Sequence, residues 1–210
     1  MVREMIRELI REFNLLISAV GGQGGLTLSR VIANTAVKMG LKVRVGETLG
    51  MSQRGGAVVS FVRIGEDVYS PIIPEGETDV LIGMEPIEAL RVAKYVGSRT
   101  IAVVNLRPIK PVPVNLGLEE YPSIEKIIKL LVKLLGEVIG FDAYEVARRA
   151  GLTRAVNSVM LGATVALKII PLPRKNILET LLENVPKGTE EMNEAAFKLG
   201  EDIMKERALV

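Results

Sequence analysis

The chain alternates between short apolar runs and segments in which apolar residues recur every three or four positions. The first pattern is typical of buried parallel strands, and the second of helices with one buried face. The predicted strands are 13–20, 41–45, 57–64, 79–83 and 100–105. The predicted helices are 26–39, 86–96, 123–135, 142–150, 154–168, 175–184 and 189–207. Segment 106–122 is rich in proline, so we expect it to run extended with little helix.

Strand–helix alternation through residue 105 predicts an α/β fold with an open, mostly parallel sheet. We expect this sheet to be Rossmann-like and doubly wound, with a helical C-terminal half packed over it. The turn at 65–67 should lead the third strand into a hairpin with residues 68–69. The 210 residues, 48% of them hydrophobic, suit one domain with a sizeable core. We therefore divide the chain into an N-terminal extension, 1–12, and one domain, 13–210.

The extension differs in character from the domain that follows it. Over residues 2–12 the apolar side chains share one face and Arg–Glu pairs occupy the other, which predicts an amphipathic helix. Such a helix either lies on its own domain or docks on a partner subunit. It does not resemble a signal peptide, because it lacks an uncharged core and a small-residue cleavage site. The longest mainly apolar run, 158–167, is about half of the ~20 residues that a membrane span needs, so we expect a cytoplasmic protein.

Cysteine and histidine are both missing, and their absence narrows the chemistry that the chain can perform. The chain has no cysteine, which excludes disulfides, thiolate metal sites and cysteine-ligated iron–sulfur clusters within it. It has no histidine, so the usual general base and a Ser–His–Asp triad are excluded as well. Lys and Arg total 27 against 25 Asp and Glu, and this net charge of +2 gives no sign of a nucleic-acid partner or an anionic membrane. The lack of cysteine and the scarcity of glutamine are typical of thermophilic proteins.

The first candidate site is the motif GGQGG at 21–25, between a predicted strand and a predicted helix. Its glycines allow backbone N–H groups to approach a ligand, and the helix amino terminus adds partial positive charge. This combination suits a phosphate or another anion. A dinucleotide fingerprint would need glycine or alanine where Thr27 stands. Three interpretations stay open: an anion or cofactor tail, a dinucleotide, or a tight turn without a ligand.

The second candidate is the ten-residue segment ETLGMSQRGG at 47–56, which is longer than the about 2–6 residues of an ordinary connection. Within it, Arg54 offers two parallel donors to a carboxylate or phosphate. The alternative is an ion pair between Arg54 and Glu47. In a doubly wound sheet both glycine-rich segments follow strands at the same carboxyl edge, so we expect them to converge on one site.

Asn157 is a third and weaker candidate. It opens the sequence NSVMLGA, which is almost wholly apolar and is therefore predicted as a buried helix. Its side chain either caps that helix or belongs to the site. Asn193 and Phe197 in the last predicted helix are interpreted as packing and capping residues.

Three segments carry a family resemblance: SAVGGQGGLTLSRVIANTA at 18–36, VGETLGMSQRGGAVVSFVRIG at 45–65 and DVLIGMEPIEALR at 79–91. With these motifs the chain resembles the gamma-type domain of 2-oxoacid:ferredoxin oxidoreductases over roughly residues 13–205. Within that family it is most similar to the indolepyruvate:ferredoxin oxidoreductase branch, where this domain forms the beta subunit. The pairing of GGQGG with ExxGMSQRGG makes the resemblance specific.

The resemblance implies a subunit of a thiamine-diphosphate enzyme that oxidatively decarboxylates 2-oxoacids, here aryl pyruvates, to acyl-CoA and reduces ferredoxin. It implies that thiamine diphosphate, Mg²⁺ and the iron–sulfur clusters lie on a larger alpha subunit. This chain would then hold no cofactor alone, with coenzyme A as its candidate ligand. No residue takes a catalytic role, because the thiazolium carbon does the covalent chemistry in this family.

The resemblance also implies roles for the candidate residues. The glycine-rich turn would form a backbone cradle near the coenzyme A phosphates or the partner's active site. The polar residues of the second segment would lie at the thiamine site or at the subunit interface. The candidate binding residues are Gly22, Gln23, Gly24, Gly25, Glu47, Ser52, Gln53, Arg54, Gly55 and Asn157. None is expected to bind a metal.

Two other functions stay open. A free-standing dinucleotide-binding oxidoreductase would bind NAD(P)H as an isolated chain, although the missing third glycine counts against it. A non-catalytic assembly subunit would use its glycine-rich loops only to dock a partner, so that changes in them would leave coenzyme A affinity unchanged.

Overall fold

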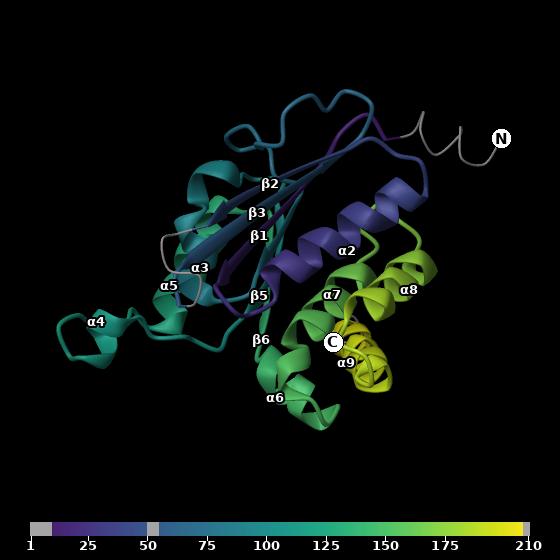
Figure 1. The fold of residues 1–210 in the computed structure, drawn as a ribbon. Coiled ribbons are helices and arrows are strands. Elements are labelled where there is room, and N and C mark those ends of the chain that lie inside the picture. The colour runs from purple at the N-terminus through teal and green to yellow at the C-terminus, as the bar shows by residue number, and fades with distance from the viewer. Residues whose placement is uncertain (1–9, 50–54, 208–210) are drawn as a thin grey trace.

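A six-stranded sheet forms the middle layer of the protein in the computed structural model, which describes residues 10–49 and 55–207 (Figure 1). The strands are β1 (Phe13–Val20), β2 (Val43–Leu49), β3 (Ala57–Ile64), β4 (Val80–Gly83), β5 (Ile101–Asn105) and β6 (Glu137–Phe141). Their order across the sheet is β2-β3-β1-β4-β5-β6. Strands β1, β4, β5 and β6 are parallel to one another, whereas β3 is antiparallel to both β1 and β2. The predicted α/β fold with a mostly parallel sheet is confirmed.

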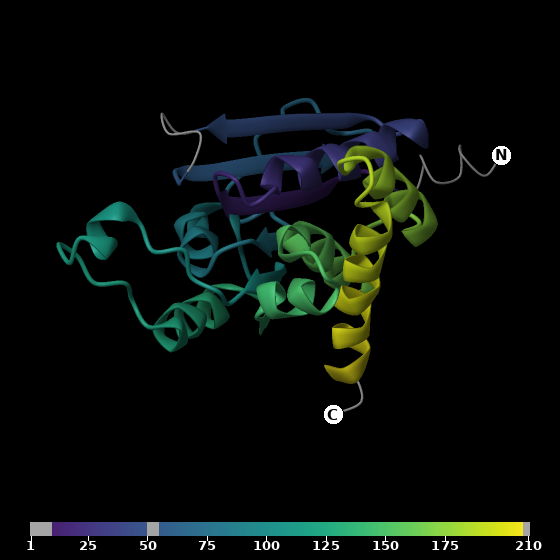
Figure 2. The ribbon, with the colours of Figure 1, turned by 60° about the horizontal axis from the view of Figure 1, so that its bottom comes forward.

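Helices cover both faces of the sheet. One face carries α2 (Gly25–Lys38), α6 (Ala143–Arg149), α7 (Val156–Ala166), α8 (Arg174–Asn184) and α9 (Glu190–Arg207). The other carries α3 (Pro86–Arg91) and α5 (Ile124–Leu134). Three short elements complete the described chain: η1 (Ala93–Tyr95), α4 (Val112–Asn115) and η2 (Thr153–Ala155). Figures 1 and 2 both place α4 at the opposite end of the molecule from α9.

Strand β1 lies between two hydrophobic cores. Leu15 and Ile17 belong to the core under α2 and the C-terminal helices, whereas Leu16 belongs to the core under α3 and α5. Successive side chains of a strand point to opposite faces, so all eight residues of β1 are buried. This arrangement explains why the run 13–20 is almost continuously apolar and why it predicts the strand residue for residue.

Helices α7 and α9 cross closely because each carries a glycine at the crossing. A Cβ on Gly162 would overlap the carbonyl oxygen of Phe197, and a Cβ on Gly200 would overlap the carbonyl oxygen of Val159. Neither side chain can be added without separating the two helix backbones. The residues of α7 from Asn157 to Val165 are all buried, so the prediction of a buried helix is confirmed.

Strand pairing changes two predictions. β2 continues to Leu49 instead of ending at Val45, because its backbone pairs with β3 from Val43 opposite Ile64 to Leu49 opposite Val58. Glu47 therefore lies in a strand and not in a loop, and the predicted loop at 47–56 is shorter than expected. β6 was not predicted, because its five residues include a glycine and form a strand only by pairing with β5.

The start of the chain also differs from the prediction. Residues 10–12 are not helical and lead directly into β1, with Ile10 buried in the core under α2. The hairpin at 68–69 does not form, because Glu66 and Asp67 donate their N–H groups to the carbonyls of Ile10 and Arg11. The rest of the predicted helix at 2–12 lies outside the described residues, so the division into extension and domain stays a prediction. Within the described ranges, no helix has both the length and the apolar character needed to cross a bilayer.

A buried carboxylate holds both ends of the segment between β5 and α5. Glu85, 1% exposed, caps α3 by accepting the Glu88 N–H through Oε2 at 3.0 Å. Its Oε1 accepts the Ile109 N–H at 3.2 Å and the Tyr121 O–H at 2.5 Å. Residues 110–120, which we call the arm, therefore leave and re-enter the body of the protein beside one side chain. Apart from the single turn α4, the arm is non-helical as its prolines predict.

The bond to Glu85 should make stability depend on alkaline pH. Burial, and then the hydrogen bond to Glu85, raise the pKa of the Tyr121 phenol far above its ordinary value. The folded state thus favours the neutral phenol. Its contribution to stability is fully present below the unfolded pKa of about 10 and is lost as the pH rises from there toward the folded pKa.

We therefore expect the free energy of unfolding to fall more steeply between about pH 9 and pH 11.5 for the wild type than for Tyr121→Phe. Denaturant unfolding at a series of pH values measures both slopes. Groups common to both proteins cancel in the difference. Equal slopes would contradict a raised pKa of the Tyr121 phenol in the folded state.

Candidate functional site

The glycine-rich turn at 21–25 lies where the winding of the sheet changes direction. From β1 the chain passes through α2 toward the β2 edge, and from β4 it passes through α3 to β5 on the other side. The carboxyl ends of β1 and β4 are therefore neighbours from which the chain departs in opposite directions. Ligands of open α/β sheets bind at this kind of position.

Two pockets flank the turn. The first, which we call the arginine pocket, has a volume of about 430 Å³ and is lined by Gly22, Gln23, Arg107, Ile109, Tyr144 and Arg154, among others. The second, of about 480 Å³, lies over the start of α2 and is lined by the other glycines of the turn and by Arg30. Both volumes fall within the range of small-molecule sites, about 300–1,000 Å³.

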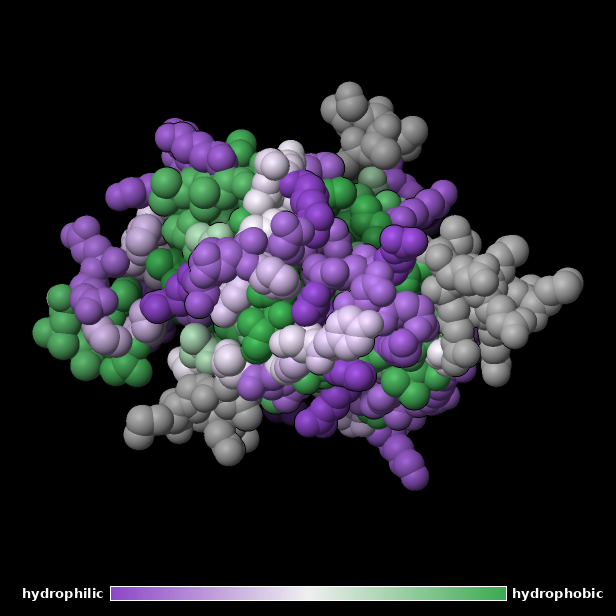
Figure 3. Space-filling model, turned by 90° about the horizontal axis from the view of Figure 1, so that it is seen from above, coloured by the Kyte–Doolittle hydropathy of each residue, from purple (hydrophilic) through white to green (hydrophobic). Residues whose placement is uncertain are grey.

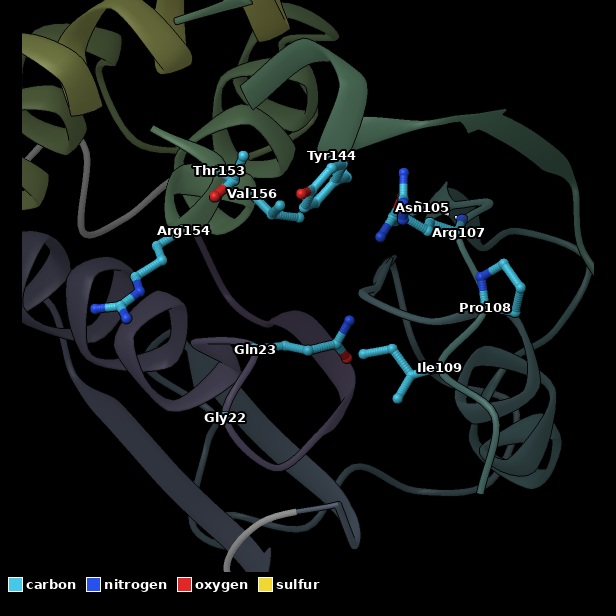
Figure 4. Close-up of a pocket in the computed structure, with 10 residues that line it drawn as sticks. All are labelled: Gly22, Gln23, Asn105, Arg107, Pro108, Ile109, Tyr144, Thr153, Arg154 and Val156. Carbon is cyan, nitrogen blue, oxygen red and sulfur yellow. Dashed lines mark hydrogen bonds between the residues drawn. The ribbon is translucent and has the colours of Figure 1, made fainter. Parts of the chain in front are cut away.

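Gln23 links the ends of β1 and β4. Its Oε1 accepts the Val20 N–H at 2.7 Å, and its Nε2 donates to the Met84 carbonyl at 2.8 Å. Figure 4 shows this side chain pointing toward Ile109. Because its amide is engaged within the protein, a ligand at the turn would meet backbone N–H groups first.

Gly24 and Asn157 lie in direct contact although they are far apart in the sequence. Gly24 has a left-handed backbone, with φ +85°, and a Cβ there would lie 2.8 Å from Asn157 Nδ2. The interpretation of Asn157 as a helix cap is wrong, because η2 precedes α7 and places the cap at Ala155. Asn157 is instead a buried residue of the first turn of α7, and its amide packs against the glycine turn. Asn193 and Phe197 are buried as expected of packing residues, and Asn193 accepts the Ser158 O–H at 2.6 Å.

The start of α2 is suited to an anion. No side chain caps it, and its first turn has no acidic residue. Arg30 and Arg154 are both exposed nearby, and no carboxylate pairs with either of them in the described part of the chain. The free N–H groups, the helix dipole and the two guanidinium groups all favour negative charge at this place.

The opposite wall of the arginine pocket is a stacked pair. The Arg107 guanidinium carbon lies 3.9 Å from the centre of the Tyr144 ring, and its Nη1 lies 3.6 Å from carboxylate oxygens of both Asp142 and Glu145. These carboxylates balance the charge of Arg107, so this wall offers a flat surface more than a positive charge. Arg154, which reaches toward α2 in Figure 4, is the unpaired cation of the pocket among its described residues.

Asn105 fixes this wall at the end of β5. Its Nδ2 donates to the Met84 carbonyl at 3.0 Å, and its Oδ1 accepts the N–H groups of Arg107 and Ala143 at 3.3 and 3.0 Å. Arg107, Tyr144 and Arg154 were not predicted as site residues. Tyr144 follows the carboxyl end of β6, and this signal was lost because β6 was not predicted. Arg107 follows the carboxyl end of β5, which was predicted, so its position was an available signal.

The second glycine-rich segment meets the turn by a hairpin. Gly21 donates its N–H to the Gly56 carbonyl at 2.8 Å, and Gly55 donates to the Gly21 carbonyl at 3.2 Å. The contact arises because β3 returns antiparallel beside β1, not because two parallel strands end together. Glu47 is exposed on β2, and its Oε1 accepts a hydrogen bond from the Ser29 hydroxyl at 3.1 Å. Ser52, Gln53 and Arg54 lie outside the described residues, as does any pairing of Arg54 with Glu47.

Among the described residues, no three acidic side chains are grouped so that they could hold a metal ion. The uncapped start of α2 favours negative charge, as do Arg30 and Arg154, which have no carboxylate partner among the described residues. The wall of Arg107 and Tyr144 adds a flat surface beside them. The site contains no general base in a buried position among its described residues.

Comparison with known proteins gives a family match over nearly the whole chain. Residues 14–203 match the family described as pyruvate ferredoxin/flavodoxin oxidoreductase. Over 198 residues the chain is 41% identical to the indolepyruvate oxidoreductase subunit IorB of Pyrococcus horikoshii, an alignment that covers 94% of this chain and 98% of that protein.

Solved structures share the fold. The gamma subunit of a keto/oxoacid ferredoxin oxidoreductase from Geobacter sulfurreducens has a TM-score of 0.66 and 21% identity, covering 92% of this chain and 99% of that chain. The 2-oxoglutarate:ferredoxin oxidoreductase from Magnetococcus marinus has a TM-score of 0.68 and 19% identity, covering 93% of this chain but 31% of that chain. In the Magnetococcus enzyme the fold is thus part of a longer polypeptide.

Proposed function

The chain belongs to the pyruvate ferredoxin/flavodoxin oxidoreductase family, and on that basis we propose that it is the small subunit of an aryl-2-oxoacid:ferredoxin oxidoreductase. The complex would convert a 2-oxoacid such as indolepyruvate, coenzyme A and two oxidised ferredoxins into an acyl-CoA, CO₂, a proton and two reduced ferredoxins. The support for an aryl substrate is the 41% identity to a subunit named for indolepyruvate.

In this proposal the larger alpha subunit holds thiamine diphosphate, Mg²⁺ and the iron–sulfur clusters. Thiamine diphosphate supplies the electron sink for decarboxylation when it is bound there. This chain has neither the cysteines that hold such clusters nor a histidine. Its own contribution would be to bind and orient coenzyme A at the edge of the partner's active site.

The observation that carries the coenzyme A assignment is the uncapped start of α2 beside Arg30 and Arg154, neither of which has a carboxylate partner among the described residues. Coenzyme A brings phosphate groups for this positive region and an adenine ring for the flat wall made by Arg107 and Tyr144. The Magnetococcus enzyme was solved with coenzyme A and succinyl-CoA bound. Gly22, Gln23, Gly24 and Gly25 would form the backbone cradle, and Asn157 would hold it in place through its contact with Gly24.

The second segment would lie between the two subunits. Its end is hydrogen-bonded to the glycine turn through Gly55 and Gly56. In this proposal Ser52, Gln53 and Arg54 lie at the partner's thiamine site or at the interface. Arg54 would pair there with a carboxylate or phosphate. Glu47 would contribute to the same site from β2.

Reconstitution tests the proposed function. We expect the purified chain to show no turnover when supplied with thiamine diphosphate, Mg²⁺, indolepyruvate, coenzyme A and ferredoxin. Adding the larger subunit that co-purifies with it from the native host should start a reduction of ferredoxin that stops when coenzyme A is omitted. Turnover by this chain alone, or a partner without thiamine diphosphate and clusters, would contradict the proposal.

A further inference from the structure

The arm, residues 110–120, projects from the body of the protein beyond α5. Figures 1 and 2 show it at one end of the molecule, and Figure 3 shows a hydrophobic cluster at the same end. Three of its apolar side chains are largely exposed: Val112 by 68%, Leu116 by 67% and Leu118 by 75%. None of the three belongs to either hydrophobic core. A concentration of exposed apolar side chains on one short projection is typical of a binding surface.

The arm has a defined conformation. Its tip is closed by hydrogen bonds from the Leu116 N–H to the Val112 carbonyl at 3.0 Å and from the Leu118 N–H to the Pro113 carbonyl at 2.9 Å. The side-chain amide of Asn115 donates a hydrogen bond through Nδ2 to the Lys110 carbonyl at 3.0 Å. At the base, Glu85 holds Ile109 and Tyr121 through one oxygen atom. Binding such a preorganised segment costs less conformational entropy than ordering a flexible one.

The base of the arm is also a wall of the proposed coenzyme A site. Pro108 and Ile109 line the arginine pocket together with Gly22 and Gln23. A protein that binds the arm would therefore lie close to the opening of this pocket. The arm and the glycine turn thus belong to one edge of the molecule.

We propose that the arm inserts its three apolar side chains into an apolar groove on the larger subunit of the complex, and that this contact seats the larger subunit over the arginine pocket. The inference rests on the proposed function. The groove should have a basic rim, because Glu119 and Glu120 follow Leu118 and have no basic partner in the described part of the chain. In the Magnetococcus enzyme, this fold makes up 31% of one chain and thus has a larger neighbour in the same polypeptide.

The arm is too small to form a stable protein interface by itself. A stable protein interface takes roughly 20–30 residues from each side. The arm spans only residues 110–120 and cannot supply so many interface residues, so it would form one part of a wider contact. The glycine turn and the hairpin of β2 and β3 lie at the same carboxyl edge and extend that contact.

A pair of matched triple variants tests the arm. Val112→Ser/Leu116→Ser/Leu118→Ser removes the three exposed apolar side chains of the arm. Val37→Ser/Tyr69→Ser/Ile72→Ser removes three from elsewhere, where the exposures are 60%, 82% and 46%. We expect the arm variant to bind the purified larger subunit at least about 100-fold more weakly and the control to bind like the wild type. Both should keep the wild-type melting temperature, because neither set belongs to a core.

The outcomes separate this inference from the proposed function. If the wild type binds no thiamine- and cluster-bearing subunit, the proposed function fails. If the wild type and the arm variant bind that subunit equally, the arm inference fails and the proposed function stands. An arm-dependent dimer of the isolated chain on gel filtration would overturn the inference in favour of a second copy.

A charge-reversal variant keeps the test decisive should the triple variant fold poorly. Glu119→Lys/Glu120→Lys changes two exposed residues and leaves the apolar side chains in place. We expect it to weaken binding of the larger subunit at low salt and to lose this effect as ionic strength rises. Unchanged binding at low salt would overturn the basic rim and, with it, the proposed groove.

Discussion

Replacing Gly162 by alanine is expected to lower the free energy of unfolding by about 3 kcal/mol or more. The added Cβ would overlap the carbonyl oxygen of Phe197, so α9 would have to move away from α7. Both helices belong to the same buried core, which resists such a movement. Intrinsic helix propensity predicts the opposite sign, because alanine is favoured over glycine by about 1 kcal/mol within a helix.

Denaturant unfolding of Gly162→Ala and Gly200→Ala measures this effect from both helices. The double variant should cost less than the sum of the two single variants, because a crossing widened for one methyl group already accommodates much of the second. Full additivity would mean that the two glycines act independently. A gain in stability for Gly162→Ala would show that the helices do not cross as closely as described.

Replacing Arg154 by alanine is expected to raise the KM for coenzyme A roughly 10- to 150-fold in the assembled complex. The guanidinium is exposed, lies beside the uncapped start of α2 and has no acidic partner among the described residues. A charge-assisted hydrogen bond to a phosphate contributes about 1.5–3 kcal/mol, and each 1.4 kcal/mol corresponds to about tenfold in affinity. The kcat should change little, because Arg154 would bind the remote phosphates and not the reacting atoms.

Arg149→Ala is the matched control. Arg149 is also exposed on the neighbouring helix α6, but it does not line the arginine pocket. Steady-state kinetics at two ionic strengths should show an effect for Arg154→Ala that shrinks with salt, and none for Arg149→Ala. An unchanged KM for Arg154→Ala would place the coenzyme A phosphates elsewhere.

Gln23 shows how a local sequence signal and a tertiary contact combine in one candidate residue. Its place among glycines at the end of a strand is a local signal, and the structure puts it at the edge of the arginine pocket. Its hydrogen bond to Met84 depends on β4 lying beside β1. No local pattern near Gln23 contains that information.

The local sequence by itself determined the position of those strands and helices that are buried on every side. The run 13–20 is apolar because both faces of β1 are covered, and NSVMLGA is apolar because α7 is buried all round. The glycines of 21–25 and the helix start that follows them were equally visible, because backbone freedom and helix polarity are local properties. Family membership followed from the same motifs.

Only the tertiary structure decided which separate segments meet. β6 exists because β5 offers it an edge, and the extension of β2 to Leu49 exists because β3 returns beside it. The contact of Gly24 with Asn157, the wall made by Arg107 and Tyr144, and the arm held by Glu85 all join residues that are distant in sequence. Strand pairing and side-chain contacts depend on the relative position of whole elements, whereas hydrophobic periodicity reports only which face of each element is buried.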